Sequence, residues 1–302
     1  MRVLVTGAAG NLGSATCAAL LAGGVEVRAT DRMTRPNLPV TVRVANLMDR
    51  EGCYTLIEGV DAIIHLGNHP NPGSADPQRL MTENTAMNVN VFQAAKELGV
   101  KKIAFASSVQ VINGDRRVPE KGPTPPSMLA YLPADGDTPA NPANLYSLSK
   151  RAGEIMLESY ARFHAMSCTA VRFPMLVTHA WGEWFAKQPI EGGAGGLVDE
   201  AFSYLFFEDA AELLAAIVKS DLPGYRVYFP ASPNPIRNRP IRELIETYYP
   251  GVRLLRPIEQ ITSLVDTSRI QRDTGWGPTR ALQGEPTTQI TQTTEDPERP
   301  LT

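Results

Sequence analysis

Short apolar runs alternate with longer segments of helical periodicity through the first 173 residues of this 302-residue chain. Glycine, proline, asparagine or aspartate bounds most of these runs, which is typical of buried strands. The predicted strands are residues 3–5, 25–30, 40–47, 61–67, 101–106 and 168–173. Between them, apolar residues recur at helical spacing, as at Met87, Val91, Ala94 and Leu98. The predicted helices are residues 14–22, 49–58, 81–98 and 146–164.

Alternating strands and helices indicate an α/β protein with a parallel sheet and right-handed crossovers. We therefore predict a Rossmann-type doubly wound sheet in residues 1–173 and a smaller, mostly C-terminal substrate-binding lobe in residues 174–282. A helix and a strand at about residues 207–231 are predicted to return to the first domain. Residues 283–302 are polar and rich in Thr and Pro, which is typical of a disordered tail.

The first predicted strand leads into a glycine turn, TGAAGNLG at residues 6–13, and then into a helix. Such a turn directs backbone amides and the positive end of the helix dipole at one point, which suits a pyrophosphate. Gly7 makes the turn, Gly10 lets the phosphates approach and Gly13 packs the helix on the strand. Asn11 and Leu12, within this turn, are included in the predicted cofactor site. The alternative is a plain strand-to-helix turn.

Asp31 stands at the end of the second predicted strand, where an acid accepts hydrogen bonds from the adenosine ribose. A carboxylate there repels a 2′-phosphate, so the sequence favours NAD over NADP. The adjacent Arg32, also assigned to the cofactor site, offers a charge that can compensate. The alternative for Asp31 is a strand-end turn residue.

Parallel strands place their carboxyl ends on one edge of the sheet, where ligands bind. Asn46 and Leu47 are predicted to meet the adenine there, although a capping role for Asn46 is nearly as well supported. Leu66 and Gly67 end the fourth strand and Ser107 the fifth, and all three are assigned to the cofactor site. His65 is predicted to be a satisfied core histidine rather than a catalytic one.

Tyr146 and Lys150 lie four residues apart, so they share one face of the predicted helix. A lysine ammonium is expected to lower the pKa of the tyrosine and to bind the nicotinamide ribose. Ser108, at the end of the fifth strand, is expected to orient a substrate oxygen. Together with the glycine turn, these residues predict hydride transfer from a hydroxyl group to NAD. The alternative is an ordinary pair on an amphipathic helix.

The sequence resembles the extended short-chain dehydrogenase/reductase family, also called the NAD-dependent epimerase/dehydratase family. The motifs that carry the resemblance are TGAAGNLG at 6–13, Asp31, DAIIHLG at 61–67, ENTAMNVNVFQAA at 83–95, FASS at 105–108, YSLSK at 146–150 and VDTSR at 265–269. The resemblance implies that Ser108, Tyr146 and Lys150 are a catalytic triad. It also implies that Asn84 and Phe173 lie near the cofactor, and that a homodimer forms through residues 81–98 and 146–164.

The chain departs from the family pattern at Gly67-Asn68, where two alanines are usual, and at Asn46, where an aspartate is usual. Its ending HLG and compact second lobe look more like uronate-dehydrogenase-type members. A nucleotide-sugar pyrophosphate requires cations. The candidates for that role are Arg226, Arg237, Arg239 and Arg242. The predicted substrate contacts are Ser108, Gln110, Tyr146, Met175 and Trp181.

The predicted function is therefore that of an NAD-dependent enzyme that removes a hydride from a secondary hydroxyl of a sugar or nucleotide-sugar. Both a sugar epimerase and a uronate or aldose dehydrogenase fit. The alternatives are a non-catalytic NAD-binding sensor or scaffold and an NADPH-dependent carbonyl reductase. The proline-rich residues 113–144 are expected to cover the site.

Composition and charge disfavour several classes of partner and site. The net charge of −3 and the lack of basic runs argue against nucleic acid, and no apolar stretch is long enough for a membrane span. The chain begins with a strand rather than a signal peptide, so a cytoplasmic protein is expected. Three widely spaced cysteines indicate free thiols, and the four histidines have no ligand spacing, so no metal is expected.

Overall fold

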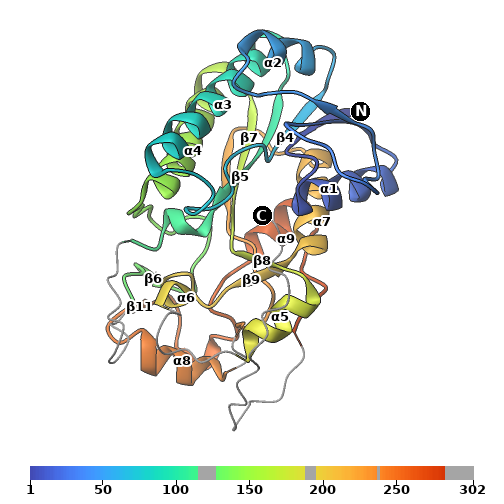
Figure 1. Cartoon of the computed structure of the whole chain (residues 1–302). Helices are drawn as coiled ribbons and strands as arrows, with labels where there is room; N and C mark the ends of the chain where they lie inside the picture. The colour runs from blue at the N-terminus through green and yellow to red at the C-terminus, as the bar shows by residue number, and fades with distance from the viewer. Residues whose placement is uncertain (115–126, 188–194, 237–238, 283–302) are drawn as a thin grey trace.

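The computed structural model describes residues 1–114, 127–187, 195–236 and 239–282. A seven-stranded sheet, in the order β10-β7-β5-β4-β1-β2-β3, forms its centre (Figure 1). Every neighbouring pair runs parallel, which confirms the predicted doubly wound, Rossmann-type sheet. The strands are β1 (Arg2–Thr6), β2 (Glu26–Asp31), β3 (Val42–Val44), β4 (Ala62–His65), β5 (Lys102–Ser108), β7 (Ser167–Phe173) and β10 (Tyr225–Tyr228).

Helices cover both faces of this sheet (Figure 1). One face carries α1 (Asn11–Ala22), α7 (Phe207–Lys219) and α9 (Ser268–Thr274), and the other carries α2 (Arg50–Ile57), α3 (Pro77–Glu97) and α4 (Leu145–His164). Successive side chains of β1 serve the two faces in turn, as period-two alternation requires. Val3 and Val5 join the core under α1 and α7, whereas Leu4 joins the core under α2 and α3.

Two of the elements whose bounds differ from the sequence expectation are α3 and β3. Helix α3 begins four residues earlier than predicted, because Asp76 caps it: Oδ1 accepts hydrogen bonds from the backbone amides of Gln78 and Arg79, at 3.1 and 3.2 Å. Pro77 occupies the first helical position, which proline suits. Strand β3 is confined to three residues at the sheet edge, where pairing comes from β2 alone.

A second group of elements lies below the C-terminal edge of the sheet (Figure 1). The short elements are η1 (Val109–Val111), β6 (Tyr131–Leu132), β8 (Met175–Val177), α5 (His179–Ala186), α6 (Gly195–Asp199), β9 (Tyr204–Phe206), α8 (Ile241–Tyr248), β11 (Arg253–Leu254) and η2 (Ile258–Gln260). Their core combines Val109, Ile112, Leu129, Leu132 and Ala134 with described apolar residues of the C-terminal part, from Val177 onward. The predicted domain boundary at residue 173 stays a prediction, and the predicted tail at 283–302 lies outside the described residues.

Candidate active site

Five predicted site residues follow directly from the parallel sheet. Gly7 follows β1, Asp31 ends β2, Gly67 follows β4, Ser108 ends β5 and Phe173 ends β7. Because all these strands point the same way, the five positions share the C-terminal edge, where α/β proteins bind ligands. Phe173 itself is buried in the core beneath α1 and α7.

The glycine turn has the geometry of a cradle for a pyrophosphate. Gly7 has a φ of +69°, and a Cβ there would lie 2.8 Å from the carbonyl carbon of Leu66. A Cβ at Gly13 would lie 2.1 Å from the Gly7 carbonyl oxygen, so only glycine lets α1 pack this close. Gly10 is the N-cap of α1 and has no side chain to accept from the first-turn amides. The turn therefore fits the phosphates of a dinucleotide.

Asp31 holds this turn in place. Its Oδ2 accepts from the backbone amide of Ala9 at 2.9 Å, and its Oδ1 accepts from that of Met33 at 3.3 Å. A carboxylate has about four lone-pair positions, so capacity remains for ribose hydroxyls. Arg32 is exposed, whereas Arg35 donates to the Asn11 side-chain oxygen at 3.0 Å and so brings a cation to the start of α1.

Asn46, Leu47 and Gly67 lie next to this turn. The Asn46 side-chain oxygen accepts from the Met48 amide at 3.0 Å, so the residue does make a turn of the capping type. Leu47 is buried, and a Cβ at Gly67 would lie 2.6 Å from Leu47 Cδ1. The contact of these residues with an adenine stays a prediction.

Helix α4 presents Tyr146 and Lys150 beside Ser108. Asn144 begins the helix with a capping box: its oxygen accepts from the Ser147 amide at 2.9 Å. One turn apart, Lys150 Nζ lies 5.7 Å from the centre of the Tyr146 ring. The Ser108 side chain lies close enough to the Tyr146 hydroxyl to lower the pKa of the phenol. The structure thus brings together all three residues of the predicted triad.

Burial dominates the electrostatics of this group. It raises the pKa of Tyr146, and a charge on Glu200 raises it further, while the nearby Ser108 hydroxyl lowers it. Burial also lowers the pKa of Lys150 to about 7. Desolvation of the phenolate is therefore the largest influence on Tyr146, and the expected lowering of its pKa by Lys150 stays a prediction. Glu200 was not anticipated from the sequence.

A buried hydrogen-bond chain holds Lys150, and most of it was missed at the sequence level. Lys150 Nζ donates to the Asn68 side-chain oxygen at 3.1 Å and to the Ala106 carbonyl at 2.9 Å. The Asn68 amide donates to Asn88 Oδ1 at 3.1 Å, and His65 Nε2 lies 3.0 Å from the same oxygen. The signal was Asn68 itself, a polar residue where the family usually has alanine.

His65 connects this chain to the glycine turn. Burial, and then the Lys150 charge, lower its pKa to about 3, so the ring is neutral. Its Nδ1 lies 2.7 Å from Thr6 Oγ1, which accepts from the amides of Leu66 and Gly67 at 3.1 and 3.0 Å. Thr6 therefore donates to Nδ1, and Nε2 donates to Asn88. The histidine is a satisfied core residue, as predicted.

Two other residues predicted to contact the cofactor are hydrogen bonded within the protein. Ser107 donates to Glu154 Oε1 at 2.7 Å, and Asn84 donates to Ser149 Oγ at 3.0 Å while its oxygen accepts from the His69 amide at 2.7 Å. Their contacts with a cofactor stay predictions.

Three of the residues predicted to contact the substrate also contact other parts of the protein. Gln110 Oε1 accepts from the Asn144 amide at 3.3 Å. Met175 packs against the core of the lower elements. Trp181 is 6% exposed and stacks on Phe185 with ring centres 5.0 Å apart. Trp181 thus packs within the core of the lower elements, and contact of these three residues with a substrate stays a prediction.

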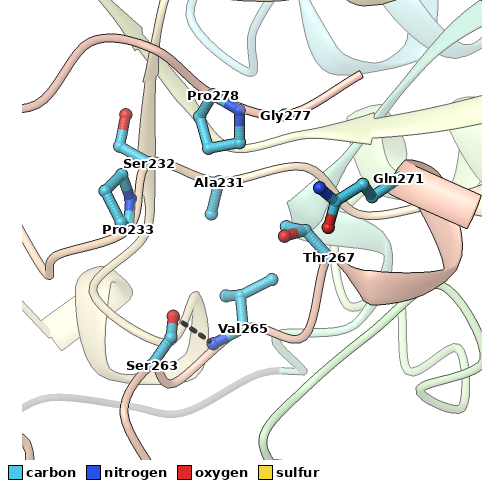
Figure 2. Close-up of a pocket in the computed structure, with 9 residues that line it drawn as sticks. All are labelled: Ala231, Ser232, Pro233, Ser263, Val265, Thr267, Gln271, Gly277 and Pro278. Carbon is cyan, nitrogen blue, oxygen red and sulfur yellow. Dashed lines mark hydrogen bonds between the residues drawn. The ribbon is translucent and has the colours of Figure 1, made fainter. Parts of the chain in front are cut away.

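A separate pocket of about 330 Å³ lies between the segment after β10 and the surroundings of α9 (Figure 2). Ser232, Ser263, Thr267 and Gln271 contribute to its lining, and Ser263 Oγ accepts from the Val265 amide at 3.3 Å. No predicted site residue lines it. Within the described ranges, no helix combines the length and apolarity of a membrane span, and no group of acidic, His and Cys side chains is placed to hold a metal.

The protein was compared with known families, sequences and structures. Residues 3–180 match the NAD dependent epimerase/dehydratase family. The chain is 28% identical over 239 residues to an NAD-dependent glucose-6-phosphate dehydrogenase of Haloferax volcanii, a match that covers 77% of this chain and 85% of that protein. It is 31% identical over 176 residues to a uronate dehydrogenase of Pseudomonas putida, covering 57% of this chain and 59% of that protein.

A solved structure with the same fold is the UDP-glucose 4-epimerase of Thermus thermophilus in complex with NAD. The TM-score is 0.64 at 23% identity, with 93% of this chain and 95% of that chain covered. The likeness extends over the sheet and the lower elements alike.

Proposed function

The chain belongs to the NAD-dependent epimerase/dehydratase family and is therefore an NAD-dependent enzyme, and we propose that it oxidises a hydroxyl group of a sugar that carries no nucleotide. The observation that carries the proposal is the placement of Ser108 beside Tyr146, with Lys150 one helical turn away.

The chemistry follows from the positions of these side chains. Ser108 orients the substrate hydroxyl, and the Tyr146 phenolate takes its proton. The two electrons of the adjacent C–H bond leave as a hydride, and the product is a carbonyl compound. NAD⁺, when bound, supplies the hydride acceptor. Lys150 is held by Asn68 and the Ala106 carbonyl. When the Lys150 amine is protonated, its charge stabilises the Tyr146 phenolate.

The cofactor is assigned to the glycine turn and its neighbours. The amides of Asn11, Leu12 and Gly13, at the start of α1, would hold the pyrophosphate, Gly10 would let it approach, and Asp31 would accept hydrogen bonds from the adenosine ribose. This assignment is supported by the close approach at Gly13 and by the Ala9–Asp31 hydrogen bond that fixes the turn. The carboxylate is the reason to favour NAD over NADP.

The arginines that a nucleotide-sugar would need are engaged elsewhere. Arg226 pairs with Asp273 at 3.3 Å, Arg239 with Glu243 at 3.4 Å and Arg242 with Glu259 at 2.9 Å. Arg237 lies outside the described residues. Because a pyrophosphate requires such cations, these pairings favour a free sugar and a dehydrogenase over a nucleotide-sugar epimerase. The names of the two relatives, both dehydrogenases, agree with that choice.

The test is NADH formation, followed by absorbance, with free aldoses, sugar acids and UDP-sugars. Tyr146→Phe should lose about 10²–10⁴-fold in rate. Tyr160→Phe, on the same helix and bonded to Gln93, is the matched control and should keep full activity. Interconversion of UDP-sugars without net NADH would favour the epimerase, and NAD binding without turnover a non-catalytic protein.

We also propose a cytoplasmic homodimer. Val89 on α3 and Leu148 and Ile155 on α4 are exposed apolar side chains on helices that pack together. Such apolar surface on paired helices suits an interface between two copies. Three buried, unpaired cysteines agree with a reducing compartment. Light scattering in solution measures the assembly directly.

A further inference from the structure

The amine of Lys150 lies against two aromatic rings as well as two hydrogen-bond acceptors. Lys150 is 3% exposed, and its Nζ donates to the Asn68 side-chain oxygen and the Ala106 carbonyl. The same Nζ lies over the ring of Phe105, 5.1 Å from its centre, and 5.7 Å from the centre of the Tyr146 ring. A cation within about 6 Å of a ring centre is attracted by the negative face of the ring, most strongly where water is excluded. The Phe105 ring is therefore one of the groups that hold the Lys150 ammonium.

Helix α4 has a glycine at the point where this ring approaches it. Gly153 lies three residues after Lys150 and is buried. A Cβ at Gly153 would lie 2.7 Å from Phe105 Cε1, so a larger residue would push the ring away from the helix. Glycine inside a helix destabilises it relative to alanine. The close approach of the Phe105 ring is the structural reason for a glycine here.

Two further rings fix the orientation of Phe105. The fully buried Phe105 stacks on His65, with ring centres 5.8 Å apart and planes inclined by 23°. It also meets Phe92 edge to face, with centres 5.7 Å apart and planes inclined by 88°. Because Ala106 follows Phe105 on β5, one strand supplies both a ring and a carbonyl to the Lys150 ammonium.

The charge of Lys150 is sensitive to its surroundings. Burial lowers the pKa of this lysine to about 7. The titratable groups that act together with it are Tyr146 on α4 and the neutral His65 on β4. Of the other charged groups on α3, α4 and β7, Glu154 pairs with Arg172 and Glu83 with His69. An attraction for the ammonium therefore extends the pH range over which Lys150 is charged.

We propose that Phe105 is a positioning residue that holds Lys150 as an ammonium beside Tyr146 through a cation–π contact. This inference rests on the proposed function, in which the charge of Lys150 stabilises the Tyr146 phenolate. The ring attracts the charged form of lysine and not the neutral amine, so it favours protonation. In a site without water, the contact is large enough to raise the pKa of a lysine by about one unit.

The experiment follows the protonation of Lys150 by NMR, in protein isotopically labelled at the lysine Cε. Lys150→Arg identifies the signal by its absence, and a Tyr146→Phe background keeps that ring while removing the second titrating group. In this background, Phe105→Leu should lower the pKa of Lys150 by about one unit. Phe92→Leu is the matched control, because Phe92 is also fully buried and contacts His65 and Phe105. It should leave the pKa of Lys150 unchanged.

A second series separates the attraction of the ring from its packing. Phe105 is replaced by phenylalanines that carry one, two or three ring fluorines, which weaken the negative face of the ring and nearly keep its shape. The pKa of Lys150 should fall stepwise with the number of fluorines, and the same replacements at Phe92 should have no effect. With Tyr146 intact, both limbs of the pH profile of kcat/KM should move to lower pH in the same order.

The outcomes separate this inference from the proposed function. A constant pKa of Lys150 across the fluorinated series, or an equal fall in the Phe92 series, overturns the role of Phe105 and leaves the dehydrogenase standing. No NADH with any sugar overturns the dehydrogenase, whereas the titration needs no substrate and still decides whether the ring holds the ammonium. If Phe105→Leu does not fold, the fluorinated proteins decide the question, because they keep the ring.

Discussion

The buried ion pair between Glu154 and Arg172 allows a direct test of how a buried charge affects the free energy of unfolding. The Glu154 side chain is fully buried and that of Arg172 is 4% exposed, and two N–O contacts of 2.9 Å join them. Ser107 donates to the same carboxylate at 2.7 Å, and Arg172 donates to the Thr138 carbonyl at 2.7 Å. The pair therefore links α4, β5 and β7 behind the candidate active site.

Replacing Glu154 leaves the buried Arg172 without its counter-charge, whereas replacing Arg172 leaves Glu154 with only the half-buried Arg151, 3.1 Å away. Such a change costs about 3–5 kcal/mol, against a total stability of about 5–15 kcal/mol for a typical protein. With a urea m value of about 3 kcal/mol/M, the unfolding midpoint should fall by about 1 M or more. We expect this loss in Glu154→Met, and a smaller loss in Arg172→Met, where Arg151 still pairs with Glu154.

The double variant Glu154→Met/Arg172→Met distinguishes the cause. It removes both charges, so it should cost clearly less than the sum of the single variants. Urea unfolding followed by circular dichroism measures all three. Arg242→Met, which breaks the exposed pair with Glu246, is the control and should leave the midpoint unchanged. Single variants as stable as this control, or strictly additive losses, would refute the reasoning.

Three further predictions concern the cofactor turn and the chain of hydrogen bonds behind Lys150. Gly13→Ala places a Cβ 2.1 Å from the Gly7 carbonyl oxygen, so NAD affinity by calorimetry should fall about tenfold or more; unchanged affinity contradicts the cradle. Asn68→Ala removes an acceptor from Lys150, so kcat should drop about tenfold or more while NAD affinity is kept, and an unaltered kcat would argue against a positioning role. The folded pKa of His65 is about 3 and its ordinary value 6.5, so between these pH values only the unfolded chain binds the proton. Stability should therefore fall as pH drops through that window, by up to about 1.4 kcal/mol per unit, and His65→Asn should show a shallower slope.

The sheet could be predicted from the sequence because its signals are local. Apolar runs marked β1, β4 and β5, and a glycine turn marked the start of α1. The early start of α3 was also indicated by local residues, the cap Asp76 and Pro77 at the first helical position, but the prediction began the helix later. The shortness of β3 could not be read in this way, because pairing at a sheet edge depends on the neighbouring strand.

The candidate site could be predicted only in part, because some of its residues are neighbours on one helix and others meet only in the folded protein. Tyr146 and Lys150 share one helix, so their spacing alone places them together. Asn68 reaches the site from a loop, and only the tertiary fold brings it near Lys150. The rise in the pKa of Tyr146 on burial could not be predicted for the same reason, since its burial depends on segments that local spacing does not reveal.

The way the lower core is assembled has a consequence for how the chain is made on the ribosome. Leu129, Leu132 and Ala134 pack with residues from the last quarter of the sequence, and the Leu282 amide donates to the Tyr204 hydroxyl at 2.8 Å. Synthesis proceeds from the N-terminus, so strands β1 to β5 can pair early. Those apolar side chains, however, cannot complete their packing until more than 100 further residues have been synthesised. A nascent or truncated chain ending before residue 282 thus exposes apolar surface that the full-length protein buries.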